Sequence, residues 1–147
     1  MGLGNFQGNG ANHVPAYQTS GTPYVTGSGA GEVPNGTAAT PNSFKLEFPS
    51  VTRWVVVQNI GTNALRIGFS KAGVEGTGAG QYYTLQANDS AAVNSEAHTV
   101  RLELRCKDIF FSGVGGTTGF QVIAGLTGIG RAQFPILTGS NGFQGIG

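Results

Sequence analysis

The chain has 147 residues, of which 10% are charged and 26 are Gly, and its formal net charge is +1. This length fits one domain with a real core. The small net charge gives no electrostatic case for a nucleic-acid or membrane-surface partner, and the abundant Gly disfavours helices. No stretch reaches the roughly 18 apolar residues of a membrane-spanning helix. The first residues lack the basic and apolar regions of a secretory signal, so none is expected.

Residues 1–42 have the composition of an extended arm. Their only charged residue is Glu32, and they contain four prolines among many Gly, Asn, Ser and Thr. Neither a helical nor a strand period is present. Ordering such an arm costs about 1–2 kcal/mol per residue in backbone entropy, which its few apolar side chains cannot offset alone. We therefore expect this arm to pack against neighbouring molecules.

Residues 43–130 are predicted to form one β domain. Short apolar runs, several of them strictly alternating, follow one another with Gly, Pro and Asn turn signals between them. Eight short strands without any helical period are typical of a sandwich or barrel. The expected strands are 44–48, 53–59, 65–69, 81–87, 90–94, 100–107, 109–112 and 120–126.

Residues 131–147 form the third region, which contains no charged residue apart from Arg131. The tripeptide Phe143-Gln144-Gly145 repeats the Phe6-Gln7-Gly8 sequence near the start of the chain. We interpret this region as a second, C-terminal arm.

The sequence offers little for catalysis or for binding a metal. His13 and His98 have no His, Cys or acidic partner at a metal-ligand spacing. Cys106 is the only cysteine, which excludes an intrachain disulfide. It lies on the apolar face of its expected strand. We expect it to be an inert core thiol. The Gly-rich loops lack the lysine of a phosphate-binding loop. No catalytic residue, metal or cofactor is therefore predicted.

A basic stripe on one predicted strand is the only feature that suggests nucleic-acid binding. Arg101, Arg105 and Lys107 share one face, but Glu103 and Asp108 interrupt the stripe and no RNA-binding signature occurs. Cross-strand ion pairs on a solvated or interface-facing surface explain it better, so no nucleic-acid partner is expected.

Three segments of the predicted domain carry a resemblance to a known family. They are NIGTNALRIGFS at 59–70, CKDIFFSG at 106–113 and FQVIAGLTGI at 120–129. These segments, together with the order of the expected strands, resemble the vertex (penton) capsid proteins of large icosahedral DNA viruses, above all those of the chlorella-virus group. The resemblance covers roughly residues 43–129, which is about the whole predicted domain, and leaves the arms outside it.

The resemblance implies an eight-stranded single jelly-roll sandwich, here with extended Gly-rich N- and C-terminal arms. It also implies a structural protein without enzymatic activity, made in the host cytoplasm and located in the virion. Five copies would close each vertex and contact other capsid proteins, major and minor, without inserting into a membrane. The side chains expected to make assembly contacts are Phe6, Tyr17, Tyr24 and Phe143.

Two other classes of protein stay open. One is a glycan- or receptor-binding jelly roll, in which Trp54, Tyr82 and Tyr83 would stack on sugars, although Trp54 lies in a run typical of a core strand. The other is a decoration (cement) protein on a capsid, which would be trimeric rather than pentameric.

Overall fold

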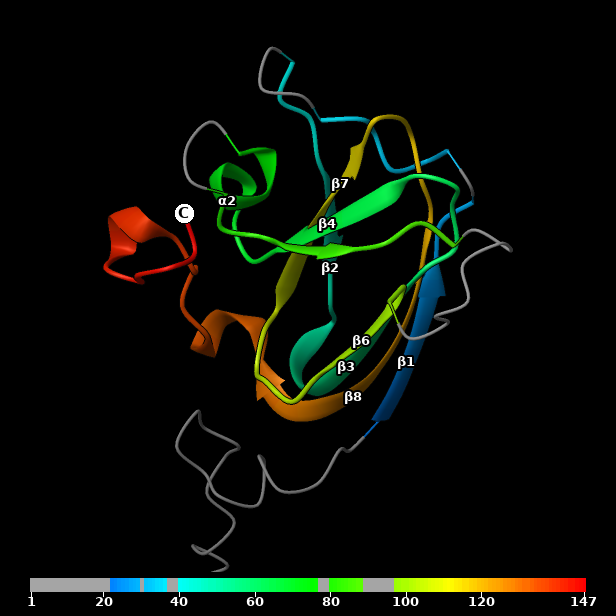
Figure 1. The fold of residues 1–147 in the computed structure, drawn as a ribbon. Coiled ribbons are helices and arrows are strands. Elements are labelled where there is room, and N and C mark those ends of the chain that lie inside the picture. The colour runs from blue at the N-terminus through cyan, green and yellow to red at the C-terminus, as the bar shows by residue number, and fades with distance from the viewer. Residues whose placement is uncertain (1–21, 30, 37–39, 77–79, 89–96) are drawn as a thin grey trace, which may run out of the picture.

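The computed structural model describes residues 22–29, 31–36, 40–76, 80–88 and 97–147, and they form mainly two four-stranded β-sheets (Figure 1). The β8 sheet has the strand order β1-β8-β3-β6, and the β7 sheet has the order β2-β7-β4-β5. The strands are β1 (Thr22–Gly27), β2 (Phe44–Glu47), β3 (Ser50–Asn59), β4 (Ala64–Gly68), β5 (Tyr83–Leu85), β6 (Thr99–Leu102), β7 (Asp108–Val114) and β8 (Phe120–Gly130).

The strands pair in order from the two ends of the domain sequence towards its middle. β1 pairs with β8, β2 with β7, β3 with β6, and β4 with β5, and every pair is antiparallel. The pairs β3–β8 and β4–β7 join them into the two sheets. The chain is therefore a long hairpin ribbon whose four strand pairs alternate between the sheets. The predicted all-β sandwich is confirmed.

Aromatic rings join the two sheets at the centre of the core. Phe120 of β8 stacks on Phe111 of β7, with ring centroids 4.3 Å apart, and a tilted contact at 5.5 Å links it to Phe44 of β2. Phe111 and Phe120 are at most 1% exposed. Aliphatic side chains from the inward positions of both sheets complete the core, among them Leu46, Val55, Val57, Leu65, Ile109 and Val122.

The first strand lies inside the segment that we expected to be an arm. β1 is an edge strand of the β8 sheet and pairs with β8 along its whole length. Farther along, Val33 is fully buried and forms a bridge with Thr118. The expectation of an arm over 1–42 is therefore wrong for residues 22–29 and 31–36, and its residues 1–21, 30 and 37–39 lie outside the described residues.

The reason for this error is local. Pro23 and Gly27 interrupt the alternation of β1, so the segment shows no strand period. An edge strand tolerates a Pro because one row of its backbone groups needs no partner within the sheet. The burial of Tyr24 and the pairing with β8 then decide the conformation.

One short helix, α2 (Lys71–Glu75), was not expected, because five residues are too few to show a helical period. The Ser70 side chain accepts a hydrogen bond from the backbone N–H of Gly73 and caps the first turn. Gly76 ends the helix in the left-handed conformation with a φ of 62°. No helix in the described part of the chain is long and apolar enough to cross a membrane. The expected strand at 90–94 lies outside the described residues.

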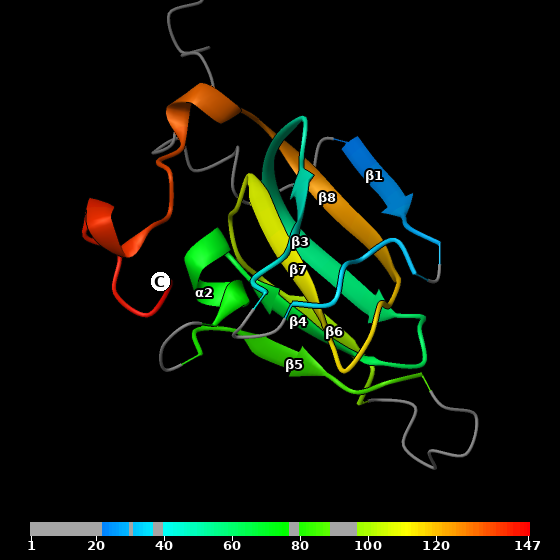
Figure 2. The same cartoon turned by 90° about the horizontal axis from the view of Figure 1, so that it is seen from above.

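The C-terminal region folds back onto its own domain and is not an extended arm. It contains two short 3-10 helices, η1 (Arg131–Gln133) and η2 (Gly139–Asn141). The Ser70 hydroxyl donates to the carbonyl of Ile146 at 2.6 Å, and Lys107 Nζ donates to the carbonyl of Phe134 at 2.8 Å. Figures 1 and 2 both show the C-terminus beside α2. Side-chain donors of the domain thus hold the backbone of this region.

Candidate assembly surfaces

The structure describes two of the four side chains predicted to contact neighbours, since Phe6 and Tyr17 lie outside the described residues. Tyr24 is half-buried and packs edge-on against Phe48, with ring centroids 5.5 Å apart. This ring therefore stabilises the chain's own core. Phe143 is half-buried and belongs to the C-terminal region, which lies beside α2 in Figures 1 and 2, whereas Tyr24 belongs to β1. The structure does not bring these two side chains together.

The outer faces of the two sheets differ in what covers them. α2 lies against β4 and β7 of the β7 sheet, and its Val74 is fully buried. At the end of the same sheet, Arg131 Nη2 donates to Asp108 Oδ1 at 2.7 Å and attaches the C-terminal region. The outer face of the β8 sheet instead carries a groove lined only by residues of its own strands. Of the described residues, none covers that groove.

An apolar row crosses this uncovered face. Val25 of β1 lies opposite Ile123 of β8, which in turn lies opposite Val56 of β3. Val25 is 71% exposed and Ile123 is 44% exposed, although a solvated sheet face normally carries polar side chains. The groove has a volume of about 380 Å³, and none of the described side chains that line it is charged. We call it the outer groove; its main residues are Val25, Thr26, Val56, Gln58, Gln121 and Ile123.

Trp54 lies beside the outer groove and not in the core. The Arg101 guanidinium lies 4.9 Å from the centroid of its ring, a cation–π contact on the outer face of the sheet. Because side chains alternate along β3, the inward position belongs to the neighbouring Val55, which is fully buried. The expectation of a core Trp54 is therefore wrong.

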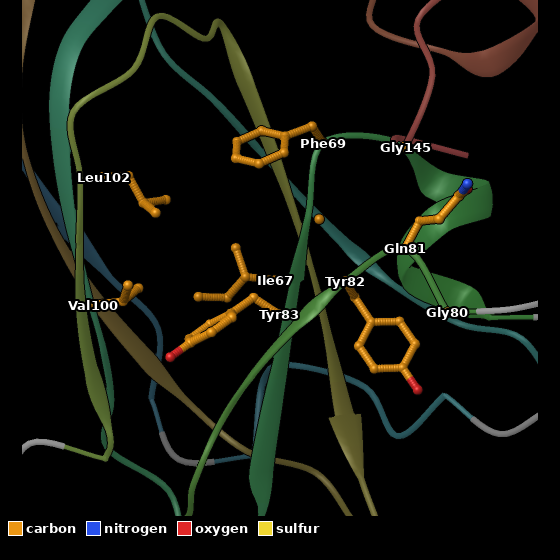
Figure 3. Close-up of a pocket in the computed structure, with 10 residues that line it drawn as sticks. Ile67, Phe69, Gly80, Gln81, Tyr82, Tyr83, Val100, Leu102 and Gly145 are labelled. Carbon is orange, nitrogen blue, oxygen red and sulfur yellow. The ribbon is translucent and has the colours of Figure 1, made fainter.

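A second opening lies between the edge strands β5 and β6, as Figure 3 shows. Tyr83 of β5 pairs with Ile67 of β4, so both side chains point into the sandwich, yet Tyr83 is 60% exposed. Val100 and Leu102 of β6 face them across the gap. We call this opening, with a volume of about 370 Å³, the edge slot (Ile67, Phe69, Tyr83, Val100 and Leu102). The described residues thus leave the apolar interior open at this edge.

The three aromatic residues considered for sugar binding do not form one platform. Tyr82 points away from Tyr83 in Figure 3, and its ring lies 4.4 Å from the guanidinium of Arg66. Trp54 belongs to the other sheet. A single sugar ring therefore cannot stack on all three.

Cys106 is fully buried, as the sequence predicted for a core thiol. Its Sγ lies 3.3 Å from Thr52 Oγ1, and its backbone N–H donates to the same oxygen at 3.1 Å. Burial raises the pKa of the thiol from 9.0 to about 12, and the Thr52 hydrogen bond offsets only part of this effect. A thiol that stays protonated at neutral pH is a poor nucleophile.

This raised pKa predicts a loss of stability at alkaline pH. Between pH 9.0 and about 12 the unfolded chain releases the thiol proton while the folded chain keeps it. Rising pH therefore favours unfolding. The protonated Cys106 thiol makes its full contribution to the free energy of unfolding only below pH 9.0. Across this window, the free energy of unfolding should fall by about 1 kcal/mol per pH unit more in the wild type than in Cys106→Ala. Urea titrations on both sides of pH 9.0 measure the difference, and parallel curves would contradict it.

Within the described ranges, no group of three or more His, Cys, Asp and Glu side chains could hold a metal ion. The two apolar openings were not predicted from the sequence. The outer groove depends on the register between Val25, Ile123 and Val56, and the edge slot depends on where the two sheets part. Neither property has a local sequence signal, apart from the apolar residues themselves.

In comparisons with known proteins, no family model matches the chain, and no curated protein is significantly similar to it in sequence.

Proposed function

We propose that this chain is a structural capsid protein of the vertex (penton) kind, five copies of which form a ring in the shell of a large icosahedral DNA virus. The observation that carries the proposal is the pair of apolar openings, the outer groove and the edge slot, on one small domain. A ring requires two different contact faces per copy, because its interfaces join unlike surfaces. Uncharged openings suit such burial, since no ion loses its hydration.

The fold that we propose for this protein is a single jelly roll. The pairing of β1 with β8, β2 with β7, β3 with β6 and β4 with β5 supports it. A jelly roll has eight strands in two sheets, as expected for an antiparallel ribbon wrapped around a core. The resemblance of residues 59–70, 106–113 and 120–129 to vertex capsid proteins points in the same direction.

The proposed partners are other copies of the chain and other capsid proteins, major and minor. Residues 1–21, with Phe6 and Tyr17, retain the contact role that the sequence first assigned to a longer arm. Tyr24 no longer belongs to this set because its ring packs on Phe48. The proposed capsid role requires no catalytic group, no cofactor and no nucleic-acid partner.

A charge placed in the outer groove tests the proposal. We expect the full chain to self-associate in sedimentation velocity, and Ile123→Asp to weaken the association by about tenfold or more, because a carboxylate would replace buried apolar surface. Ile136→Asp is the matched control, since Ile136 is also exposed, at 63%, but lies in the C-terminal region. A wild-type chain that stays monomeric at every concentration, or equal association of both variants, would contradict the proposal.

A further inference from the structure

The outer groove has the chemistry of a site for an uncharged peptide. Gln58 of β3 lies opposite Gln121 of β8, and both side chains border the groove. Their amides can donate to and accept from a peptide backbone. Beside them, Val25 and Ile123 offer exposed apolar surface for side chains. An occupant of this groove should therefore combine free backbone groups, few charges and scattered apolar residues.

Residues 1–21 of the same chain have this composition. They contain no Asp, Glu, Lys or Arg, and their larger apolar residues are separated mainly by Gly, Asn, Ala and Gln; these apolar residues are Met1, Leu3, Phe6, Val14 and Tyr17. Such a segment can be buried in an uncharged groove without desolvating a charged side chain. The composition of the segment thus matches that of the groove.

The direction of β1 indicates which copy provides the segment. Residues 1–21 join the domain at Thr22, whereas the groove borders the other end of β1, from Val25 to Gly27. Pro23 restricts Thr22 to extended backbone, so at this residue the chain follows the axis of β1, whose groove end is at Gly27. A chain of this length spans up to about 70 Å when extended, which is enough to reach an adjacent molecule.

We propose that the outer groove binds residues 1–21 of a second copy of this chain. The inference rests on the proposed function and adds which two surfaces meet between adjacent copies. Phe6, Val14 and Tyr17 supply the apolar contacts, and the amides of Gln58 and Gln121 bind the backbone of the segment.

Disulfide trapping between two singly substituted full-length chains tests the inference. One chain carries Ile123→Cys in the groove, and the other carries Ala16→Cys or Gln7→Cys, which leave Phe6 and Tyr17 intact. The native Cys106 does not interfere because it is fully buried. Since neither chain carries both new cysteines, a product joining them arises only between copies. Ile136→Cys with the same partners is the control for an exposed position outside the groove.

We expect the Ile123→Cys chain to form at least about tenfold more of the mixed disulfide than the Ile136→Cys chain, because binding raises the local concentration of the two thiols. Peptide mapping identifies the linked residues. If the chain forms oligomers but yields no such excess, the inference is wrong and the proposed function stands. If no oligomer forms, both are wrong. A chain carrying both Ile123→Cys and Ala16→Cys that closes only within itself would assign the groove to its own segment, which would also overturn the inference.

Discussion

Phe120→Ala is expected to lower the free energy of unfolding by about 3–5 kcal/mol. Phe120 is 1% exposed and belongs to the β8 sheet, but its ring contacts Phe111 and Phe44 of the β7 sheet. Its removal would leave a cavity between the two layers and cost both aromatic contacts. The ring thus links the two sheets.

Urea denaturation followed by the fluorescence of Trp54, the only tryptophan, measures this effect. Phe120→Leu is the matched control, because it keeps an apolar side chain in the site and should lose no more than about 2 kcal/mol. A loss below about 1 kcal/mol for the alanine variant would show that the two sheets do not depend on this ring.

Asn59→Ala is expected to cost about 3 kcal/mol, because it removes the centre of a buried hydrogen-bond network. Asn59 is fully buried at the end of β3. Its Nδ2 donates to the carbonyls of Asn63 and Gln86, both at 2.8 Å. Its Oδ1 accepts from the Gly61 N–H at 3.0 Å and from the Thr118 hydroxyl at 2.8 Å. All four hydrogen-bonding positions of the amide are therefore used.

Asn63→Ala is the control for this substitution. The Asn63 side chain makes an exposed hydrogen bond to the carbonyl of Thr117, so its loss should cost less than about 1 kcal/mol. The backbone carbonyl that Asn59 uses stays in place. Chemical denaturation of both variants under the same conditions gives the two losses in the free energy of unfolding. Equal losses would mean that the buried hydrogen bonds of Asn59 contribute no more to stability than the exposed one of Asn63.

The sequence predicted those features that depend on local alternation. Val100 and Leu102 pack against the core while Arg101 is exposed, as their period of two indicates. Cys106 is also fully buried, although β6 ends at Leu102 and the strand expected over 100–107 is therefore too long at its end. Such a pattern can be predicted without the fold, because a strand with one buried face places every second side chain inward whatever its partner.

The features that the sequence did not reveal depend on contacts between distant residues. β1 is stabilised by pairing with β8, which is the last strand in the sequence. Pro23 and Gly27 conceal the alternation of β1. The same pairing sets Val25 beside Ile123 and so creates the outer groove. Likewise, Tyr83 occupies an inward position but is exposed, because the described strands β5 and β6 do not close the sandwich between them. No local pattern encodes these relations.

These contacts also determine which truncation is informative. Deleting residues 1–42 would remove β1 and the buried Val33, and it would therefore test folding and not assembly. Deleting residues 1–21 leaves every described strand intact. Only the shorter deletion separates a role in assembly from a role in stability.

The number of copies in the associated protein tests the proposed vertex function most directly. Native mass spectrometry of the full chain, at concentrations where sedimentation detects association, gives this number without any assumption about shape. We predict a closed assembly of five copies, since a ring of unlike interfaces ends when it closes. A species of three copies would favour a decoration protein, and a monomer at all concentrations would contradict an assembly role for this chain.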